Sequence, residues 1–93
     1  MIGKHVIVTT GFRGVFFGKL AAYNKGARRC TLTGARNIIY WSGRRGFLGI
    51  AAHGPEGGSV LGSTAPAIEL HKITSVAECT PTATKALSEW TTP

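Results

Sequence analysis

The first forty residues alternate apolar and polar side chains in steps of two, which is the repeat of a β-strand and not of a helix. Residues 4–9 are rich in β-branched side chains, and residues 15–23 have the length of a long bent strand with Gly18 at a bulge. The tripeptide Asn-Lys-Gly at 24–26 tolerates positive φ and predicts a tight hairpin, after which residues 27–33 return antiparallel. The alternation therefore predicts a sheet of neighbouring strands.

The composition changes after this pattern, near the centre of the chain. Residues 34–37 are expected to interrupt the sheet. Residues 42–66 contain seven of the thirteen glycines, which predicts a glycine-rich insertion that is mostly loop. Thr80 followed by Pro81 is a typical helix start, so residues 80–90 are expected to form a short C-terminal helix. The remaining strands are expected at 38–41, 67–73 and 76–79.

The length of 93 residues suits one domain, residues 1–93, with a small core. We therefore predict a mainly β protein, a small and strongly curved antiparallel sheet or barrel with a glycine-rich insertion and a short C-terminal helix. No apolar run is long enough to span a membrane, so no membrane partner is expected. Cys30 and Cys79 are too sparse for a disulfide scaffold or a zinc site, which predicts two buried free thiols and no metal.

Positive charge is concentrated in the first part of the chain. Residues 1–55 contain nine Lys and Arg and no acidic residue, whereas residues 56–93 hold all four glutamates against two lysines. Aspartate is absent, which leaves little material for paired-carboxylate catalysis or for a cation site with several oxygen ligands. The positive field favours an anionic partner: a nucleic acid, a nucleotide or an acidic protein. The alternative is a basic face that only keeps the protein soluble.

Two arginines that follow two aromatic residues form the main candidate for a ligand site. Arg44 and Arg45 lie between glycines, shortly after Tyr40 and Trp41. Guanidinium groups bind phosphate with paired hydrogen bonds, and an aromatic ring can stack on a base. The four residues are thus the combination that a nucleotide-binding protein needs. The alternative is an arginine pair in a solvated loop beside ordinary core or sheet-edge aromatics.

Six further residues complete the predicted ligand-binding set. Arg36 and Asn37 precede the aromatic strand, where Asn37 either reads a base or ribose edge or occupies a turn. The insertion resembles a phosphate cradle in composition, although it lacks the Walker-loop sequence, and the alternative is a disordered loop or a loop at a hairpin tip. Of the three histidines, only His53 has a setting that favours a ligand contact, and the alternative is a structural or surface role. The residues included from the insertion are His53, Ser59, Ser63 and Thr64.

Catalysis is not expected from this set of residues. The serines lack a nucleophile-elbow motif, and no aspartate exists to orient a histidine. His53 and Glu56 are the only conceivable acid–base pair, and a glycine-rich loop would hold them poorly. We therefore expect a protein that is not an enzyme and needs no cofactor.

Two resemblances extend these expectations. Residues 14–20, the hairpin at Asn24 and residues 30–37 are similar to the second and third strands of small SH3-like and Sm-like barrels. The segments RGVFFGKL, GARNIIYWSG, GFLGIAAHGP and GSVLGSTAP resemble small phage-encoded proteins of unassigned function, which implies a viral context but no site residues. Asn24 stands where Sm proteins have an acidic turn residue, and the insertion has no Sm counterpart, so ring assembly on RNA is not expected.

The leading hypothesis is a non-enzymatic, phage-type binding protein in the cytoplasm of an infected bacterial host. Its basic pockets would sequester a phosphate-bearing small molecule, such as a nucleotide signal of host immunity, as a counter-defence. One alternative is a small-barrel RNA- or DNA-binding protein in which Tyr40 and Trp41 stack on bases. The other is a virion or host-protein adaptor. The adjacent Phe16 and Phe17 should expose one ring on each sheet face, which predicts a homo-oligomer.

Overall fold

The computed structural model describes residues 1–11, 14–41 and 46–91. The chain is mainly β and has a short C-terminal helix, which confirms the predicted fold class. The elements in chain order are β1 (His5–Thr10), β2 (Val15–Asn24), β3 (Arg29–Tyr40), α1 (Gly46–His53), β4 (Val60–Leu61), β5 (Ala65–Leu70), β6 (Ile73–Glu78) and α2 (Pro81–Glu89). Among the residues described, no helix has the length and apolar character needed to cross a membrane.

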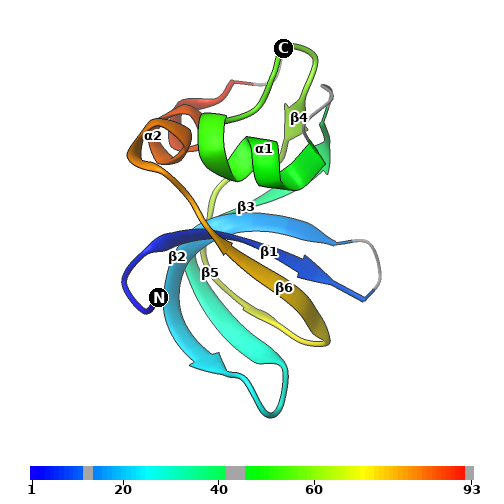
Figure 1. The fold of residues 1–93 in the computed structure, drawn as a ribbon, viewed down its shortest axis with the longest axis vertical. Helices are drawn as coiled ribbons and strands as arrows, with labels where there is room; N and C mark the ends of the chain where they lie inside the picture. The colour runs from blue at the N-terminus through cyan, green and yellow to red at the C-terminus, as the bar shows by residue number, and fades with distance from the viewer. Residues whose placement is uncertain (12–13, 42–45, 92–93) are drawn as a thin grey trace.

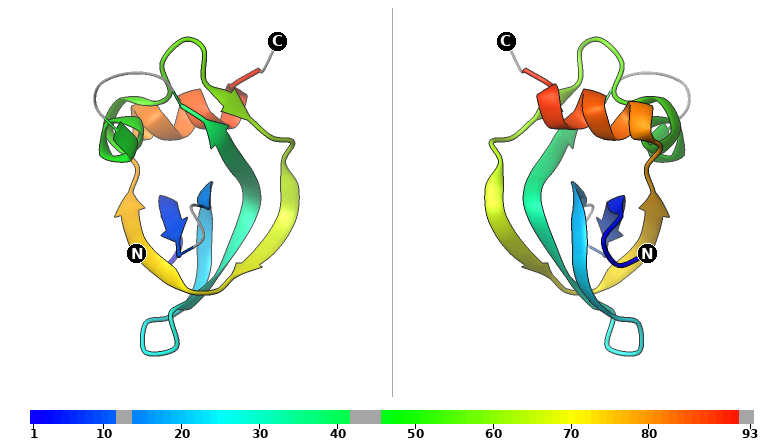
Figure 2. Two further views of the ribbon diagram at one scale, coloured as in Figure 1. Left: turned by 90° about the vertical axis from the view of Figure 1, so that its right-hand side faces the viewer. Right: turned by 90° about the vertical axis from the view of Figure 1, so that its left-hand side faces the viewer.

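All strand pairs are antiparallel, and the sheet order is β4-β3-β2-β1-β6, with β5 also paired to β3. The long strand β3 pairs with β5 over its first half and with β4 at its end. Strands β5 and β6 therefore lie at opposite edges of the sheet, yet only His71 and Lys72 separate them in sequence. The sheet must curl to satisfy so short a connection, and Figures 1 and 2 show the strands curving around a common interior without closing.

Two clusters of buried side chains hold the curled sheet together. The first, which we call the sheet core, lies among the strands and contains Val6, Val8, Leu20, Cys30, Leu32, Ala35, Leu70 and Ile73. The second, the helix-side core, joins strands to both helices and contains Ile7, Val15, Phe17, Ile38, Ile50, Ala51, Leu61, Cys79, Ala83 and Leu87. Since successive side chains of a strand point to opposite faces, β1 contributes to both cores and is buried on both sides.

The two helices lie together at one end of the molecule, opposite the hairpin that joins β2 to β3 (Figure 1). Thr80 is the N-cap of α2, as predicted, and its hydroxyl accepts a hydrogen bond from the Ala83 backbone N–H at 3.1 Å. The same hydroxyl donates to the Ala52 carbonyl at the end of α1 at 2.6 Å. Ala83 and Leu87 are the buried residues of α2, so its apolar stripe faces the core as expected.

Three local expectations about secondary structure are wrong. The chain does not break at 34–37, because Gly34 adopts a φ of 55° and lets β3 bend without ending. The 42–66 segment is not mostly loop, since it contains α1 and β4, and α1 buries Ile50 and Ala51 in the helix-side core. The stretch 67–73 is not one strand, because the chain turns at Lys72, whose φ is 56°.

The predicted bulge at Gly18 is confirmed by a shift in the β2–β3 register between Phe17 and Lys19. A Cβ atom at Gly18 would lie 2.9 Å from the Leu32 Cβ and 3.1 Å from the Thr33 carbonyl oxygen. A larger residue at this position would therefore clash with β3, and glycine is required.

The exposure that we expected for the phenylalanine pair is wrong. Phe17 is 2% exposed in the helix-side core, where its ring stacks on His5 with a centroid distance of 5.5 Å. Phe16 is half-buried against the sheet core on the opposite face. Within one chain, the helix-side core covers Phe17 and the sheet core covers part of Phe16. This pair therefore gives no argument for a homo-oligomer.

Both cysteines are free and buried, as predicted. Burial raises the pKa of the Cys30 thiol, and burial together with the Glu78 carboxylate raises the pKa of Cys79 to about 12. Because the thiolate is the reactive form, both thiols are expected to react slowly with a thiol reagent in native buffer and rapidly after denaturation. Time-resolved labelling measures this, and rapid labelling of the native protein would contradict the burial of these strands.

Candidate functional site

Arg36, predicted from the sequence to contact a ligand, supports the fold instead. Its side chain is 8% exposed. The Arg36 Nε donates a hydrogen bond to the Gly62 carbonyl at 2.8 Å, and a terminal nitrogen donates to the carbonyls of Leu87 at 2.9 Å and Trp90 at 2.7 Å. These bonds tie β3 to the segment after β4 and to the end of α2. A guanidinium buried in this way is not presented to a phosphate.

Two other predicted residues pack into the fold, Trp41 partly buried and Ser59 buried. Trp41 packs against the helix-side core. Ser59 is 2% exposed, and its carbonyl accepts a hydrogen bond from the indole Nε1 of Trp90 at 3.0 Å. Both residues therefore contribute to the packing around α2.

The remaining described residues of the predicted set are exposed, and the structure brings only some of them together. Tyr40 is 57% exposed at the end of β3. Asn37 accepts a backbone hydrogen bond from Gly62 at 2.8 Å, which places it near Ser63 and Thr64. These three exposed polar residues share one edge of the sheet. Arg44 and Arg45 lie outside the described residues, so their part in a site stays a prediction.

His53 lies apart from this edge, at the last position of α1. It lines a small cleft of about 90 Å³ together with Gly54, Pro55 and Glu56. This cleft is well below the volume of about 300–1,000 Å³ that small-molecule sites usually have. The structure thus gives His53 no ligand-sized pocket of its own.

Positively charged side chains lie together at the end of the molecule opposite the two helices, where the β2–β3 turn and the β5–β6 turn meet (Figure 1). Lys25 and Arg28 lie in the β2–β3 turn, Arg29 begins β3, and Lys72 lies in the β5–β6 turn. The Ile73 backbone N–H donates to the Arg28 carbonyl at 3.2 Å, which holds the two turns side by side. We call Lys25, Arg28, Arg29 and Lys72 the basic end. All four of these side chains are exposed, and none of the turn residues is acidic.

Short local hydrogen bonds fix the shape of the basic end. The Asn24 side-chain oxygen accepts a bond from the Ala27 N–H at 3.0 Å, and the Lys25 carbonyl accepts one from the Arg28 N–H at 3.3 Å. Arg28 has a φ of 55°, so the chain reverses there and Arg29 starts the return strand. The hairpin predicted at 24–26 is confirmed, and its cations are carried on an ordered turn.

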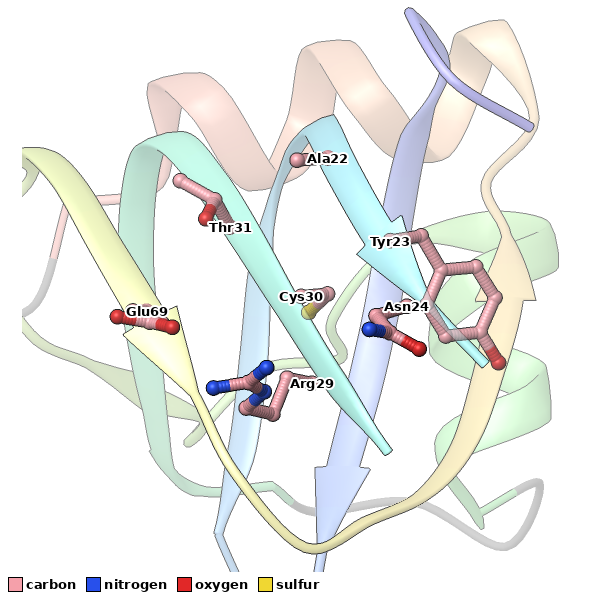
Figure 3. Close-up of a pocket in the computed structure, with 7 residues that line it drawn as sticks. All are labelled: Ala22, Tyr23, Asn24, Arg29, Cys30, Thr31 and Glu69. Carbon is pink, nitrogen blue, oxygen red and sulfur yellow. The ribbon is translucent and has the colours of Figure 1, made fainter. Parts of the chain in front are cut away.

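A pocket of about 240 Å³ opens beside the basic end (Figure 3). Its lining residues are Ala22, Tyr23, Asn24, Arg29, Cys30, Thr31 and Glu69. Strand register explains the grouping, because Ala22 pairs with Thr31, Thr31 pairs with Glu69, and Asn24 pairs with Arg29. Figure 3 shows Glu69 and Tyr23 at opposite ends of this group, with Arg29 and Asn24 between them.

The electrostatics of the pocket combine a cation, a carboxylate and neutral hydrogen-bonding groups. The His71 Nε2 lies 4.0 Å from a Glu69 carboxylate oxygen, and both side chains are more than half exposed, so this contact is weak. Burial raises the pKa of the Cys30 thiol, which therefore stays protonated at neutral pH. Arg29 can bind phosphate or carboxylate with two bonds, Tyr23 offers a ring, and Asn24 and Thr31 are hydrogen-bonding groups.

A second cleft, of about 400 Å³, lies where α2 begins. Lys4, His5 and Lys85 line it together with Glu78. Burial and the charge of Lys19 lower the pKa of His5, so this ring is neutral at pH 7. The Glu78 carboxylate opposes the two lysines, and the cleft has less positive charge around it than the basic end.

The sequence contained a signal for the pocket that we did not use. Tyr23 and Asn24 precede the predicted hairpin and Arg28 and Arg29 follow it, so antiparallel pairing alone brings an aromatic ring, an amide and two guanidinium groups together. The contribution of Lys72 could not be read in this way, because the β5–β6 turn meets the hairpin only in the folded sheet. Within the ranges that the structure describes, no three His, Cys or acidic side chains are grouped to hold a metal ion.

Comparison with curated proteins and with solved structures finds no match. A family model matches residues 3–87, which include every strand and most of α2. The chain therefore belongs to the family described as a domain of unknown function, DUF6948.

Proposed function

We propose that this protein is a non-enzymatic binding protein whose basic end takes a phosphate-bearing nucleotide. The observation that carries the proposal is the meeting of two cationic turns beside a pocket that also contains an aromatic ring and an amide. Positively charged hydrogen-bond donors bind phosphate strongly, and an aromatic ring provides a flat surface on which a base can stack. The basic end supplies the cations from two neighbouring turns, and Tyr23 supplies the ring.

The pocket has room for only one part of a nucleotide. Its volume of about 240 Å³ is smaller than most sites that enclose a whole ligand, so it takes one part of a nucleotide, the base or the sugar. The phosphate then lies outside, where the side chains of Lys25, Arg28 and Lys72 are exposed to solvent. Arg29 borders both regions and can bond to the phosphate with its guanidinium.

A binding role is supported over catalysis by the chemistry of the lining residues. Cys30 is the nucleophile of strongest intrinsic reactivity in the pocket, but burial raises its pKa and keeps it in the unreactive thiol form. Glu69 is exposed, and its carboxylate oxygen lies 4.0 Å from the His71 Nε2. Neither arrangement activates a nucleophile by a base at hydrogen-bond distance.

Single-stranded nucleic acid is the second candidate ligand, and a specific observation favours it. The cations of the basic end extend beyond the pocket onto two separate turns, as expected for a surface that contacts several phosphates in succession. Such a surface would make each additional nucleotide add to the affinity. A pocket for one nucleotide would not.

Calorimetry with nucleoside monophosphates and single-stranded oligonucleotides of increasing length separates the two candidates. We expect a monophosphate to bind once per chain, with an affinity that longer oligonucleotides do not improve. Affinity that rises with length and falls with salt, by a slope of about 0.7 per neutralised phosphate, would replace this function with nucleic-acid binding. If neither kind of ligand binds, the basic end is not a nucleotide site and an acidic protein becomes the better partner.

The proposal also includes a relationship to small SH3-like barrels, a viral setting and self-association. The sheet order, in which β1 lies between β2 and the last strand, supports a relationship to small SH3-like barrels. In the viral setting that the phage resemblance implies, nucleotide binding would sequester a signal of host immunity. Self-association is now supported by the exposed Ile39 and Leu48 rather than by phenylalanines. Light scattering that gives only the 9.8 kDa chain mass at micromolar concentration would remove self-association from the proposal.

A further inference from the structure

The carboxylate of Glu69 has no evident purpose in a pocket that serves only to hold an anion. It is the one acidic group among the described residues that line the pocket, and it lies on β5 in register with Thr31. An ionised carboxylate only accepts hydrogen bonds, and it repels phosphate. The ligand must therefore present to Glu69 something other than its phosphate.

The surroundings of Glu69 leave its oxygens available to a ligand. The contact with the His71 Nε2 is 4.0 Å, which is longer than a hydrogen bond. The neighbouring positions in the same row, Thr31 and Ala22, have small side chains. Arg29 and Glu69 both line this pocket (Figure 3), which puts a donor for phosphate and an acceptor for another group beside the same opening.

We infer that Glu69 selects a nucleotide that presents two neighbouring hydrogen-bond donors, while Arg29 and the other cations of the basic end hold its phosphate. This inference rests on the proposed function. The two oxygens of a carboxylate can accept two adjacent donors at once. In a nucleotide that chemistry occurs as the paired hydroxyl groups of ribose or as the paired N–H groups on the edge of guanine. The pocket thus recognises the base or the sugar, and the cations outside it bind the phosphate.

The test compares the wild type with Glu69→Gln by calorimetry against three probes: guanosine, adenosine and deoxyguanosine monophosphate. Glutamine keeps the size of the side chain but replaces one acceptor by a donor and removes the charge. For the preferred probe we expect an affinity loss of about tenfold to a hundredfold, which is the range for a hydrogen bond to a charged group. The matched control is Glu78→Gln, an exposed strand position that does not line the pocket, and its affinity should stay that of the wild type.

The probes also distinguish the two sources of paired donors. If the ribose hydroxyls are read, the guanosine and adenosine probes bind alike and the deoxy probe binds less tightly. If guanine is read, the guanosine and deoxyguanosine probes bind alike and the adenosine probe binds less tightly. Equal binding of all three, with a Glu69→Gln affinity that is unchanged or higher, would overturn the inference and leave nucleotide binding intact. Failure of the wild type to bind any probe would overturn the proposed function, and this inference with it.

Discussion

Replacing Arg36 by alanine is expected to destabilise the protein by about 3 kcal/mol or more, because one buried and two part-buried carbonyl groups lose their charged donor. The carbonyls of Leu87 and Trp90 belong to the end of α2, where the helix has no backbone donors left to satisfy them. The positive guanidinium also stabilises the negative end of the helix dipole there. A third bond, to Gly62, links the same side chain to the segment that leaves β4.

Urea and thermal unfolding measure this effect. For a domain of this size, melting temperature falls by about 4–8 °C for each kcal/mol, so the Arg36→Ala variant should melt at least about 12 °C lower. Arg36→Lys keeps the charge but has a single nitrogen for three carbonyls, and should lie between the wild type and alanine. The control Arg29→Ala removes an exposed arginine of the same strand and should change stability by less than about 0.5 kcal/mol. Equal melting temperatures for the Arg36 and Arg29 variants would contradict the structural role.

The fold was predictable from the sequence wherever local pattern decides it. Two-residue alternation identified β1, β2 and most of β3, and Thr80 with Pro81 marked the start of α2. Prediction from the sequence failed where long-range packing decides the local structure. Lys72 turns the chain with a φ of 56° although lysine is not a turn residue, because β5 and β6 must reach opposite sheet edges. Likewise α1 forms in a glycine-rich segment because it packs on α2 and the sheet.

The candidate site was less predictable for the same physical reason. From the sequence alone, Arg36 cannot be distinguished from a ligand-binding arginine. The Leu87 and Trp90 carbonyls that accept its hydrogen bonds lie 51 and 54 positions away along the chain, at the end of α2. Trp41 similarly joins the helix-side core through residues distant in the chain. The pocket beside the hairpin depends mainly on local pairing and could have been found. Its partner turn at Lys72 could not, because only the curled sheet brings it next to Arg28.

Removing both arginines of the hairpin is expected to weaken nucleotide binding by about two to four powers of ten. Each charge-assisted interaction with phosphate contributes about 1.5–3 kcal/mol, and 1.4 kcal/mol corresponds to tenfold in affinity. The variant should be Arg28→Asn with Arg29→Ala, because Arg28 has a φ of 55° and asparagine tolerates this conformation better than alanine. Its melting temperature should stay close to that of the wild type, since both side chains are exposed.

The matched comparison is Arg44→Ala with Arg45→Ala, which removes the same charge from the segment that the sequence first suggested. A local site at the hairpin requires the hairpin variant to lose far more affinity than this one, in calorimetry at one salt concentration. Equal losses would mean that both pairs act only through a diffuse positive field, which long-range electrostatics allows but a pocket does not. A loss confined to the Arg44 and Arg45 variant would move the site to that segment. Because both variants change the net charge from +7 to +5, any difference between them reports where the phosphate binds and not how much charge the protein carries.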